Sequence, residues 1–384
     1  MRDGLIIRNG HVIDTAAGTD GVMDVAVRGG RIAAVGRELP KGEREMDASG
    51  CFVVPGLIDY HTHLFRAGCA LAVDPALLLP MGVTTAVDAG TAGFVNFEAF
   101  YRSAIVPSLI KIYAYLSVSP VGLVSAQYHT RYDPDAIDEE AIRAILERHG
   151  ERILGLKLMM GRDNVGEDPD WALRLLEQTV ELAQRLGPEL RVVVHATDPP
   201  CAAGGIAQRL RAGDIFCHCF HGKGQTILGA DGKVLPEIWA ARERGVLFDA
   251  ANGVSHYSHR VAKAAIAQGF LPDIISSDVV SAAVNYSRRN KGLPHLMSKY
   301  VNLGLPLHTV LRAVTETPAR LLGAEGKLGT LRPGACADMA IFTVAEQAQR
   351  FDDFEDRAMT GRQNILIQAT ILRGELAYRR PDFT

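Results

Sequence analysis

No stretch of the chain approaches the run of about 18 apolar residues that a membrane-spanning helix requires. The sequence also lacks an excess of basic residues, since 41 Lys and Arg against 44 Asp and Glu give a formal net charge of −3. We therefore expect no affinity for nucleic acid or for an acidic membrane surface. The first residues show neither the apolar segment nor the cleavage site of a secretory signal. These absences favour a cytoplasmic protein.

The chain also lacks the cysteine spacing of a disulfide-stabilised protein. Its six cysteines are spread from Cys51 to Cys336 without a disulfide framework, so we expect them to be reduced, as in the cytosol. Cys217 and Cys219 flank His218. Because side chains alternate along a strand, both thiols are expected to point away from the face that His218 serves. We interpret these two cysteines as buried packing residues.

What the sequence does contain is a change of pattern along its length. Its 384 residues exceed the size at which one hydrophobic core usually stops growing, so we expect a large and a small domain. Alternating apolar and polar residues with Asn-Gly and Gly-Gly turn signals predict short strands before residue 54 and again after Pro333–Gly334. We predict that residues 1–54 and 325–384 together form a small β-sandwich domain, and that residues 55–324 form the large domain.

The large domain alternates apolar strand-like runs with amphipathic helical stretches, which is the pattern of parallel βαβ units. Eight such runs occur, at residues 56–64, 83–90, 110–118, 153–160, 191–197, 214–220, 246–252 and 273–279. Helices are expected between them, for example over residues 138–150 and 169–187; Asp168 and Asp170 stand near the start of the second and Gly187 at its end. The pattern predicts an α/β protein whose large domain is a (β/α)8 TIM barrel.

The first predicted barrel strand ends in the sequence DYHTH, which contains His61 and His63. Period-two alternation places both imidazoles on one face, where they can reach the same ion. Two structural histidines are the alternative interpretation. The position at the carboxyl end of a barrel strand favours a metal site, because active sites of this fold lie at that end.

Further candidate ligands end other predicted strands. His195 follows VVV, His218 ends the sixth run, and Asp278 follows IISS in the eighth. Lys157 lies within the apolar run GLKLMM, where an unpaired ammonium is costly to bury. It is either a lysine that reaches the surface or an ion-pair partner, or else a desolvated amine that carbon dioxide can carboxylate.

These motifs resemble the amidohydrolase superfamily, within the branch of dihydroorotases and hydantoinases and closest to its deacetylase-like members. The resemblance rests on PGLIDYHTH at Pro55–His63, on Lys157, His195 and His218, on SSDV around Asp278, and on TPARLLG to ADMAIF at Thr317–Phe342. It covers essentially the full length of the chain. The members of this branch are often oligomeric, so a homo-oligomer is left open.

The resemblance implies a site with two divalent metal ions, zinc being the first choice and iron, manganese or cobalt the alternatives. His61, His63 and Asp278 would hold one ion, while His195 and His218 would hold the other. A carboxylated Lys157 would bridge the ions together with a hydroxide. Asp278 would also be the catalytic residue, since it would accept a proton and return it to the leaving group.

The sequence departs from the dihydroorotase pattern at one informative position. In dihydroorotases an arginine two residues after the His-x-His pair binds the substrate carboxylate, whereas here Phe65 occupies that place and Arg66 is out of phase. Other side chains that could contact the substrate follow the sixth, seventh and eighth strands. They are His221, Asn252, His256, Tyr286 and Arg288.

The resemblance favours a metal-dependent hydrolase that cleaves an amide or ester bond in a small carboxylate-bearing substrate, such as an N-acyl amino acid or an O-acetyl hydroxy acid. The first alternative is a cyclic amidase of the dihydroorotase or hydantoinase type. The second is a metal-free binding or scaffold protein. The complete ligand set, from His61 to Asp278, argues against the second alternative.

Overall fold

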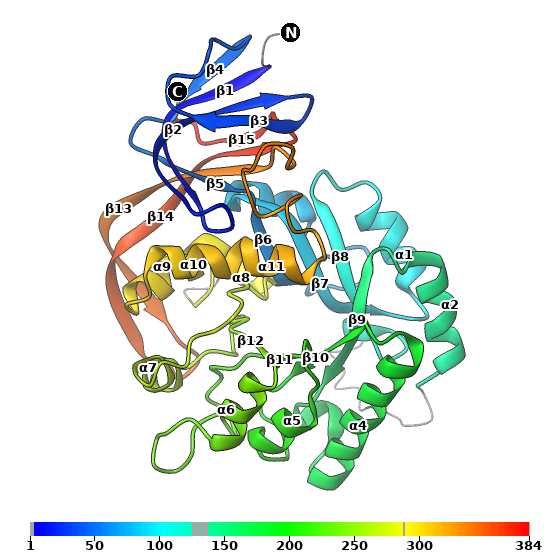
Figure 1. Cartoon of the computed structure of the whole chain (residues 1–384). Coiled ribbons are helices and arrows are strands. Elements are labelled where there is room, and N and C mark those ends of the chain that lie inside the picture. Colours follow the sequence, from blue (N-terminus) through cyan, green and yellow to red (C-terminus); the bar gives the residue numbers. More distant parts are fainter. Residues whose placement is uncertain (1–3, 125–131, 133–136, 287–288, 384) are drawn as a thin grey trace.

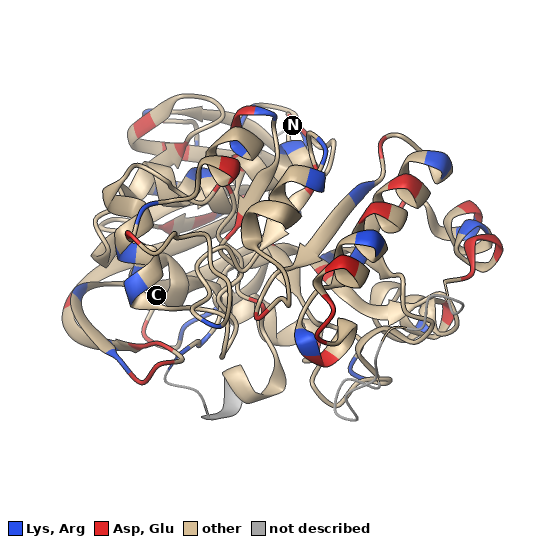
Figure 2. Cartoon of the chain, turned by 90° about the horizontal axis from the view of Figure 1, so that it is seen from below, with Lys and Arg blue, Asp and Glu red and all other residues tan. Residues whose placement is uncertain are grey.

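The computed structural model describes residues 4–124, 132, 137–286 and 289–383. The chain has an α/β fold in which a curled parallel sheet carries helices on its outside, and a second sheet lies at one end (Figure 1). Among the described residues, no helix is both long and apolar enough to cross a membrane. Lys and Arg are interspersed with Asp and Glu in the view of Figure 2, which agrees with the small net charge.

The parallel sheet contains seven strands in the order β12-β11-β10-β9-β8-β7-β6. They are β6 (Leu57–Thr62), β7 (Val83–Gly93), β8 (Lys111–Ser117), β9 (Ile153–Met159), β10 (Arg191–His195), β11 (Ile215–Cys217) and β12 (Leu247–Asp249). Each lies within a run that the sequence predicts as a barrel strand or overlaps it. The strands are almost entirely buried, as expected for a parallel sheet with both faces covered.

The eighth predicted strand, over residues 273–279, closes the curl of the sheet without forming a regular ladder. It makes single parallel bridges on its two sides, from Ile274 to Asp249 of β12 and from Val279 to Thr62 of β6. Within this segment the hydroxyls of Ser276 and Ser277 donate hydrogen bonds to the buried carboxylates of Asp249 and Asp59. This segment delivers Asp278 to the edge where the other strands end.

Helices follow most of these strands and cover the outside of the sheet (Figure 1). They are α1 (Phe97–Phe100), α2 (Glu139–His149), α3 (Arg162–Val165), α4 (Pro169–Leu186), α5 (Ala203–Arg209), α6 (Pro236–Glu243), α7 (His259–Ala267), α8 (Ser281–Tyr286), α9 (Leu293–Asn302), α10 (Leu307–Val314) and α11 (Glu316–Leu321), with a 3-10 helix η1 (Pro75–Met81) and a π-helical turn η2 (Tyr101–Ile105). The predicted helices over residues 138–150 and 169–187 correspond to α2 and α4. The carboxylate of Asp168 caps α4 by accepting hydrogen bonds from two backbone amides of its first turn.

Both ends of the chain contribute to a second sheet of eight strands, which we call the terminal sheet. Its strands are β1 (Leu5–Asp14), β2 (Thr19–Arg28), β3 (Arg31–Gly36), β4 (Arg44–Asp47), β5 (Phe52–Pro55), β13 (Met339–Asp352), β14 (Ala358–Leu372) and β15 (Glu375–Arg379). The antiparallel pairing of β5 with β13 unites the two terminal segments. The division at residues 54 and 325, and the arrangement of this sheet as a two-layered sandwich, stay predictions.

The Gly-Gly and Asn-Gly pairs of this sheet have different local structures. Gly29 and Gly30 form the turn between β2 and β3, and both have positive φ, which glycine adopts at little cost. The Asn9–Gly10 pair, by contrast, lies inside β1 and produces a register shift between Ile7 and Gly10. An Asn-Gly pair therefore makes a β-bulge here, because the strand continues to pair with β2 on both sides of it.

The β13–β14 hairpin is much longer than the strands predicted after Gly334. It leaves the terminal sheet and runs along the barrel as far as α7 (Figure 1). At its tip, the carboxylate of Asp353 accepts a hydrogen bond of 2.9 Å from the backbone amide of His259, the first residue of α7. The terminal sheet thus contacts the barrel near the ends of the parallel strands.

Candidate metal centre

The candidate ligands converge at the carboxyl end of the parallel sheet. His61 and Lys157 lie in β6 and β9, His195 ends β10, and His218 directly follows β11. Most of the candidate ligands surround one cavity of about 330 Å³. The ligand candidates that line it are His61, His63, Lys157, His195 and Asp278.

A first group joins the two histidines of the His-x-His motif to Asp278. His63 Nε2 lies 3.1 Å from Asp278 Oδ1, and His61 Nε2 lies 3.8 Å from the same oxygen. Possible ligand atoms of all three residues lie within 4.8 Å of one another, and the three side chains are buried. Two imidazoles and one carboxylate so arranged are suited to a divalent transition-metal ion.

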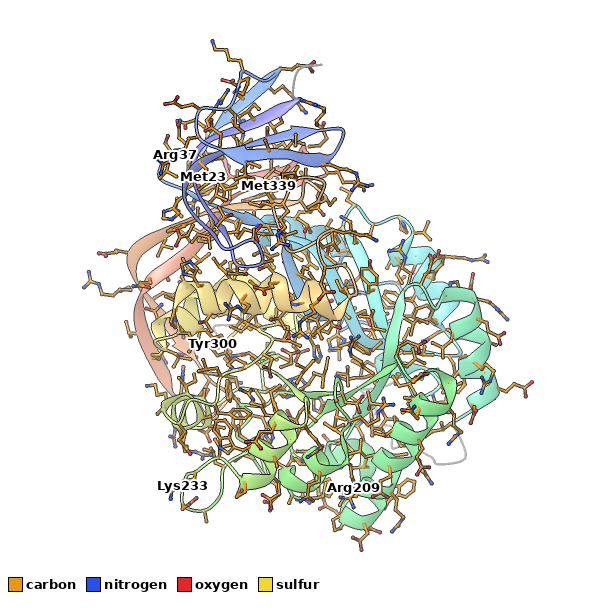
Figure 3. The ribbon with its side chains drawn as sticks, in the orientation of Figure 1. Met23, Arg37, Arg209, Lys233, Tyr300 and Met339 are labelled. Atoms are coloured by element: carbon orange, nitrogen blue, oxygen red, sulfur yellow. The ribbon has the colours of Figure 1, made fainter. Side chains whose placement is uncertain are left out.

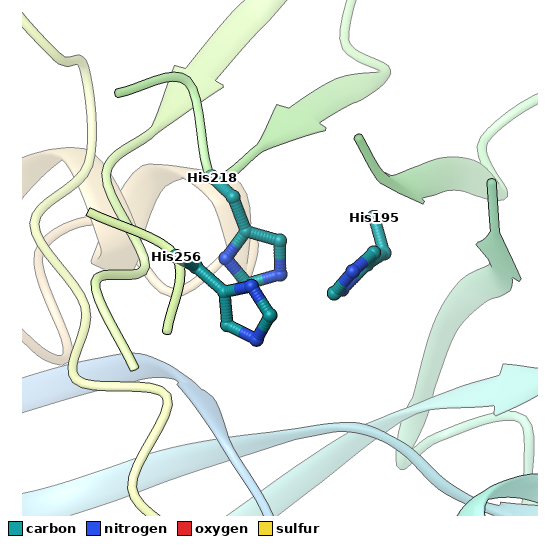
Figure 4. Close-up of side chains that lie close together, drawn as sticks. All are labelled: His195, His218 and His256. Carbon is teal, nitrogen blue, oxygen red and sulfur yellow. The ribbon is translucent and has the colours of Figure 1, made fainter. Parts of the chain in front are cut away.

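A second group consists of His195, His218 and His256 (Figure 4). The ring centroids of His195 and His218 are 4.3 Å apart, and that of His256 lies 4.4 Å from His218 and 4.8 Å from His195. From the sequence, His256 is expected to be a substrate contact. The structure places its imidazole within ligand distance of the other two.

Lys157 lies in the cavity with these groups. Its side chain is buried, with 1% of the residue exposed, and Nζ has no hydrogen-bond partner among the described residues. Gly90 makes room for it, since a Cβ atom at position 90 would lie 2.6 Å from Lys157 Cγ. An unpaired ammonium in such surroundings is costly, so this lysine is neither a surface residue nor an ion-pair partner.

Hydrogen bonds from the surrounding protein orient the imidazoles. His218 Nδ1 donates to the carbonyl oxygen of Ala251 at 2.6 Å, which leaves the lone pair on Nε2, a buried atom without a hydrogen-bond partner in the part of the chain that the structure describes. His63 Nδ1 lies 2.8 Å from Thr91 Oγ1, and the Thr91 hydroxyl donates to the buried carboxylate of Asp88. His63 therefore donates through Nδ1 and directs the lone pair of Nε2 toward Asp278, which is how a hydrogen bond to the other ring nitrogen orients a ligand histidine.

Burial keeps the imidazoles in the neutral form that binds metals. Loss of water around His61, His195 and His218 lowers the pKa of each well below its usual value, and neighbouring positive groups lower it further. Neutral imidazoles, one carboxylate and two buried atoms without partners, Lys157 Nζ and His218 Nε2, fit the ligands of divalent metal ions.

Two candidate ligands have a backbone conformation that is uncommon outside glycine. His218 has φ of 60° and Asp278 has φ of 51°. Such left-handed residues are held in place by surrounding structure and often occur at functional sites. The turn at His218 also ends the regular alternation of β11, so Cys217 does not point away from the site. Cys217 is buried as predicted, but its Sγ lies 3.4 Å from His61 Nδ1.

The remaining predicted substrate contacts fall in different places. His256 lines the cavity, and its Nε2 lies 3.8 Å from Asp278 Oδ2. Asn252 is buried behind the cavity wall and accepts a hydrogen bond of 2.9 Å from Tyr300. His221 is fully buried, and burial lowers its pKa to about 3. Tyr286 ends α8 and its side chain is outside the described part of the chain, as is the whole of Arg288.

Several residues around the site were not singled out from the sequence. Thr197 contacts His256, Asp88 and Thr91 support His63, and Asp249 lies beneath His61, with Asp249 Oδ2 3.6 Å from His61 Nδ1. Burial raises the pKa of Asp249 to about 7. Asp88 and Asp249 are carboxylates inside apolar strands, and that conflict between residue type and predicted burial is the signal that could have found them.

Comparisons with known proteins identify the family of this chain. The model of the amidohydrolase family matches residues 52–374. A deacetylase of Agrobacterium fabrum is 32% identical over 330 residues, which cover 84% of this chain and 79% of the relative. The crystal structure of an adenine deaminase has a TM-score of 0.88 at 26% identity and covers 98% of this chain and 100% of that chain. The crystal structure of a dihydroorotase has a TM-score of 0.86 at 28% identity and covers 97% of each chain. The chain therefore belongs to the amidohydrolase family and is a hydrolase.

Proposed function

We propose that this protein is a binuclear metal-dependent hydrolase that cleaves the amide or ester bond of a small carboxylate-bearing substrate, an N-acyl amino acid or an O-acetyl hydroxy acid. The observation that carries the proposal is the buried ammonium of Lys157, which lacks a partner among the described residues and lies in the cavity that two groups of ligands share. Deacetylases among the relatives favour acyl-group hydrolysis.

Carboxylation of the neutral Lys157 amine by carbon dioxide, with release of one proton, would replace the unpaired ammonium by an anion whose charge bound cations would neutralise. The product is an anion with two oxygen atoms, which suits it to bridging two cations. His61, His63 and Asp278 would hold one cation, and His195 and His218 the other; His256 lies close enough to His195 and His218 to contribute as well. Zinc is the first choice for this imidazole-rich set.

When bound, two divalent cations supply Lewis acidity, which lowers the pKa of a water molecule and polarises the scissile carbonyl. The chain supplies the proton transfer. Asp278 lines the cavity with its Oδ1 toward His63 and its Oδ2 toward His256. From this position its carboxylate can accept the proton of the attacking water and deliver it to the leaving group.

The structure weakens the case for a cyclic amidase that recognises its substrate as dihydroorotases do. Phe65 is buried against Phe100, with ring centroids 5.3 Å apart. Arg66 lines a separate cavity of about 260 Å³ near η1 and does not line the cavity of Lys157. Neither residue is placed to bind a substrate carboxylate beside the metal ligands.

Metal content and a substrate screen test the proposal together. Plasma emission on the purified protein should find about two metal ions per chain. The screen pairs N-acyl D- and L-amino acids and O-acetyl hydroxy acids with dihydroorotate and hydantoins, and we expect turnover of the acyclic substrates. Turnover of dihydroorotate or hydantoins alone would favour the cyclic amidase. Failure to bind metal after reconstitution with zinc and bicarbonate would favour a binding or scaffold protein instead.

A further inference from the structure

The mouth of the cavity contains two cationic side chains in different electrostatic situations. Arg162 pairs with Glu167 and also has its Nε 3.5 Å from Asp198 Oδ1, so carboxylates of the protein already neutralise it. Lys223 follows β11 in the chain and lines the same cavity. Within the described part of the chain, no carboxylate lies within ion-pair distance of its ammonium. Lys223 is therefore the cation that retains an unsatisfied charge at this mouth.

An aromatic ring positions the ammonium of Lys223 without neutralising it. Lys223 Nζ lies 5.4 Å from the centroid of the Phe354 ring, within the range of a cation–π contact. Gly222 allows the close packing, since a Cβ atom at position 222 would lie 2.7 Å from Phe354 Cε1. The ring interacts with the charge through its face, so the ammonium keeps its capacity to donate hydrogen bonds to an anion.

Phe354 is held rigidly although it belongs to the long hairpin of the terminal sheet. Its backbone amide donates to the carbonyl oxygen of Tyr257 at 3.2 Å. On either side of it, Asp353 accepts from the backbone amide of His259 at 2.9 Å, and Glu355 accepts from the hydroxyl of Ser258 at 3.0 Å. These bonds fix the hairpin tip to the loop that carries His256 into the cavity. The tip, the loop and Lys223 thus form one supported wall.

We propose that Lys223 binds the carboxylate of the substrate and that Phe354 is the residue that positions it. This inference deepens the proposed function and rests on it. The substrate would place its acyl group at the metal ligands and its carboxylate at the mouth, where Lys223 meets it.

Paired substrates separate recognition of the carboxylate from hydrolysis itself. N-acetylalanine and O-acetyllactate are each compared with their carboxamides on wild type, Lys223→Met and Lys223→Arg. We expect Lys223→Met to lower kcat/KM for the acids by about 10- to 100-fold, mainly through KM, because it removes a hydrogen bond to a charged group. The carboxamides should be unaffected, and Lys223→Arg should restore most of the loss. The matched control is Lys233→Met, at a lysine whose side chain is 78% exposed at the edge of the barrel (Figure 3).

Phe354 is tested by the same substrate pairs. Phe354→Leu removes the aromatic face and should raise KM for the acids several-fold. We expect little change in kcat for the acids or in kcat/KM for the carboxamides. Phe354→Tyr keeps the face and should behave as wild type. A structural role alone would change the acids and the carboxamides equally, so that result would overturn the positioning role.

Calorimetry with lactate and alanine on the metal-loaded protein distinguishes failure of the carboxylate site from failure of the proposed hydrolytic function. Binding to wild type that weakens in Lys223→Met supports the carboxylate site, even where no substrate is hydrolysed and the proposed function is wrong. Equal preference for acid over carboxamide in wild type and Lys223→Met would overturn the carboxylate site while leaving hydrolysis intact. Absence of both hydrolysis and carboxylate binding in wild type would overturn both.

Discussion

Gly253 packs so closely against Asp278 that a Cβ atom at position 253 would lie 2.3 Å from Asp278 Oδ2. The same atom would lie 2.7 Å from Cδ2 of His256, and Gly253 has φ of 53°, which favours glycine. The loop after β12 therefore supports the carboxylate that we assign to proton transfer. Only a residue without a side chain permits this contact.

Gly253→Ala should displace Asp278 and reduce turnover far more than stability. The left-handed backbone costs alanine about 1–2 kcal/mol, whereas a displacement of about 1 Å at a reacting group can reduce the rate about 100-fold. Gly269→Ala is the matched control, since Gly269 has φ of 81° but no atom near its Cβ position. Steady-state kinetics and thermal unfolding of both variants check this. Equal loss of activity in the two variants would show that the contact with Asp278 does not matter.

Lys157→Ala should lose bound metal and activity together, because the variant has no amine to form the bridging anion. Changes to residues that only hydrogen-bond to metal ligands already reduce metal affinity or activity by about 10- to 100-fold, so loss of a bridging ligand should exceed that range. Plasma emission and kinetics on the same preparation provide the measurement, with Lys233→Ala as a control at an exposed lysine. Wild-type metal content and turnover in Lys157→Ala would contradict the bridge.

Asp278→Asn should retain metal but hydrolyse slowly. The amide oxygen can still face His61 and His63, while the amide group cannot accept a proton as the carboxylate does. General acid–base catalysis contributes about 100- to 10,000-fold, so kcat should fall within that range. Metal content is measured beside kcat in the same protein. Unchanged rates would mean that another group transfers the proton.

The parts of the site that the sequence predicts belong to regular strands. His61, Lys157 and His195 lie at or near the ends of β6, β9 and β10, where alternation of side chains and the common direction of the strands bring them to one edge. Their convergence therefore follows from the residue pattern of each strand together with the parallel arrangement of the strands. Their roles as ligands stay predictions.

The parts that it does not predict depend on irregular backbone and distant contacts. His256 reaches the cavity from a loop whose path is set by hydrogen bonds with the hairpin tip around Asp353. That hairpin is polar over residues 345–363, so its sequence does not indicate strands, and pairing between β13 and β14 defines it instead. Cys217 contacts His61 because the left-handed turn at His218 ends the alternation that period-two reasoning assumes.

His295→Leu should make the stability of the protein less dependent on pH. Burial lowers the pKa of His295 in α9 to about 3, and neither ring nitrogen has a hydrogen-bond partner among the described residues. Since histidine in an unfolded chain has a pKa of about 6.5, the unfolded chain binds a proton that the folded chain excludes as the pH falls below that value. The contribution of neutral His295 is therefore present above pH 6.5 and is lost toward pH 3, by about 1.4 kcal/mol per pH unit.

Urea unfolding of wild type and His295→Leu at pH 7, 6, 5 and 4 measures the effect. The histidines of the candidate metal centre titrate in both proteins, so they cancel in the difference between the two free energies of unfolding. The ring of His295 packs against that of Phe351 with centroids 5.0 Å apart, and a leucine side chain can keep this apolar contact, so the variant should fold. The difference should favour the variant increasingly as the pH falls. A difference that stays constant from pH 7 to pH 4 would mean that His295 gains its proton equally in both states, and that its burial does not exclude the charge.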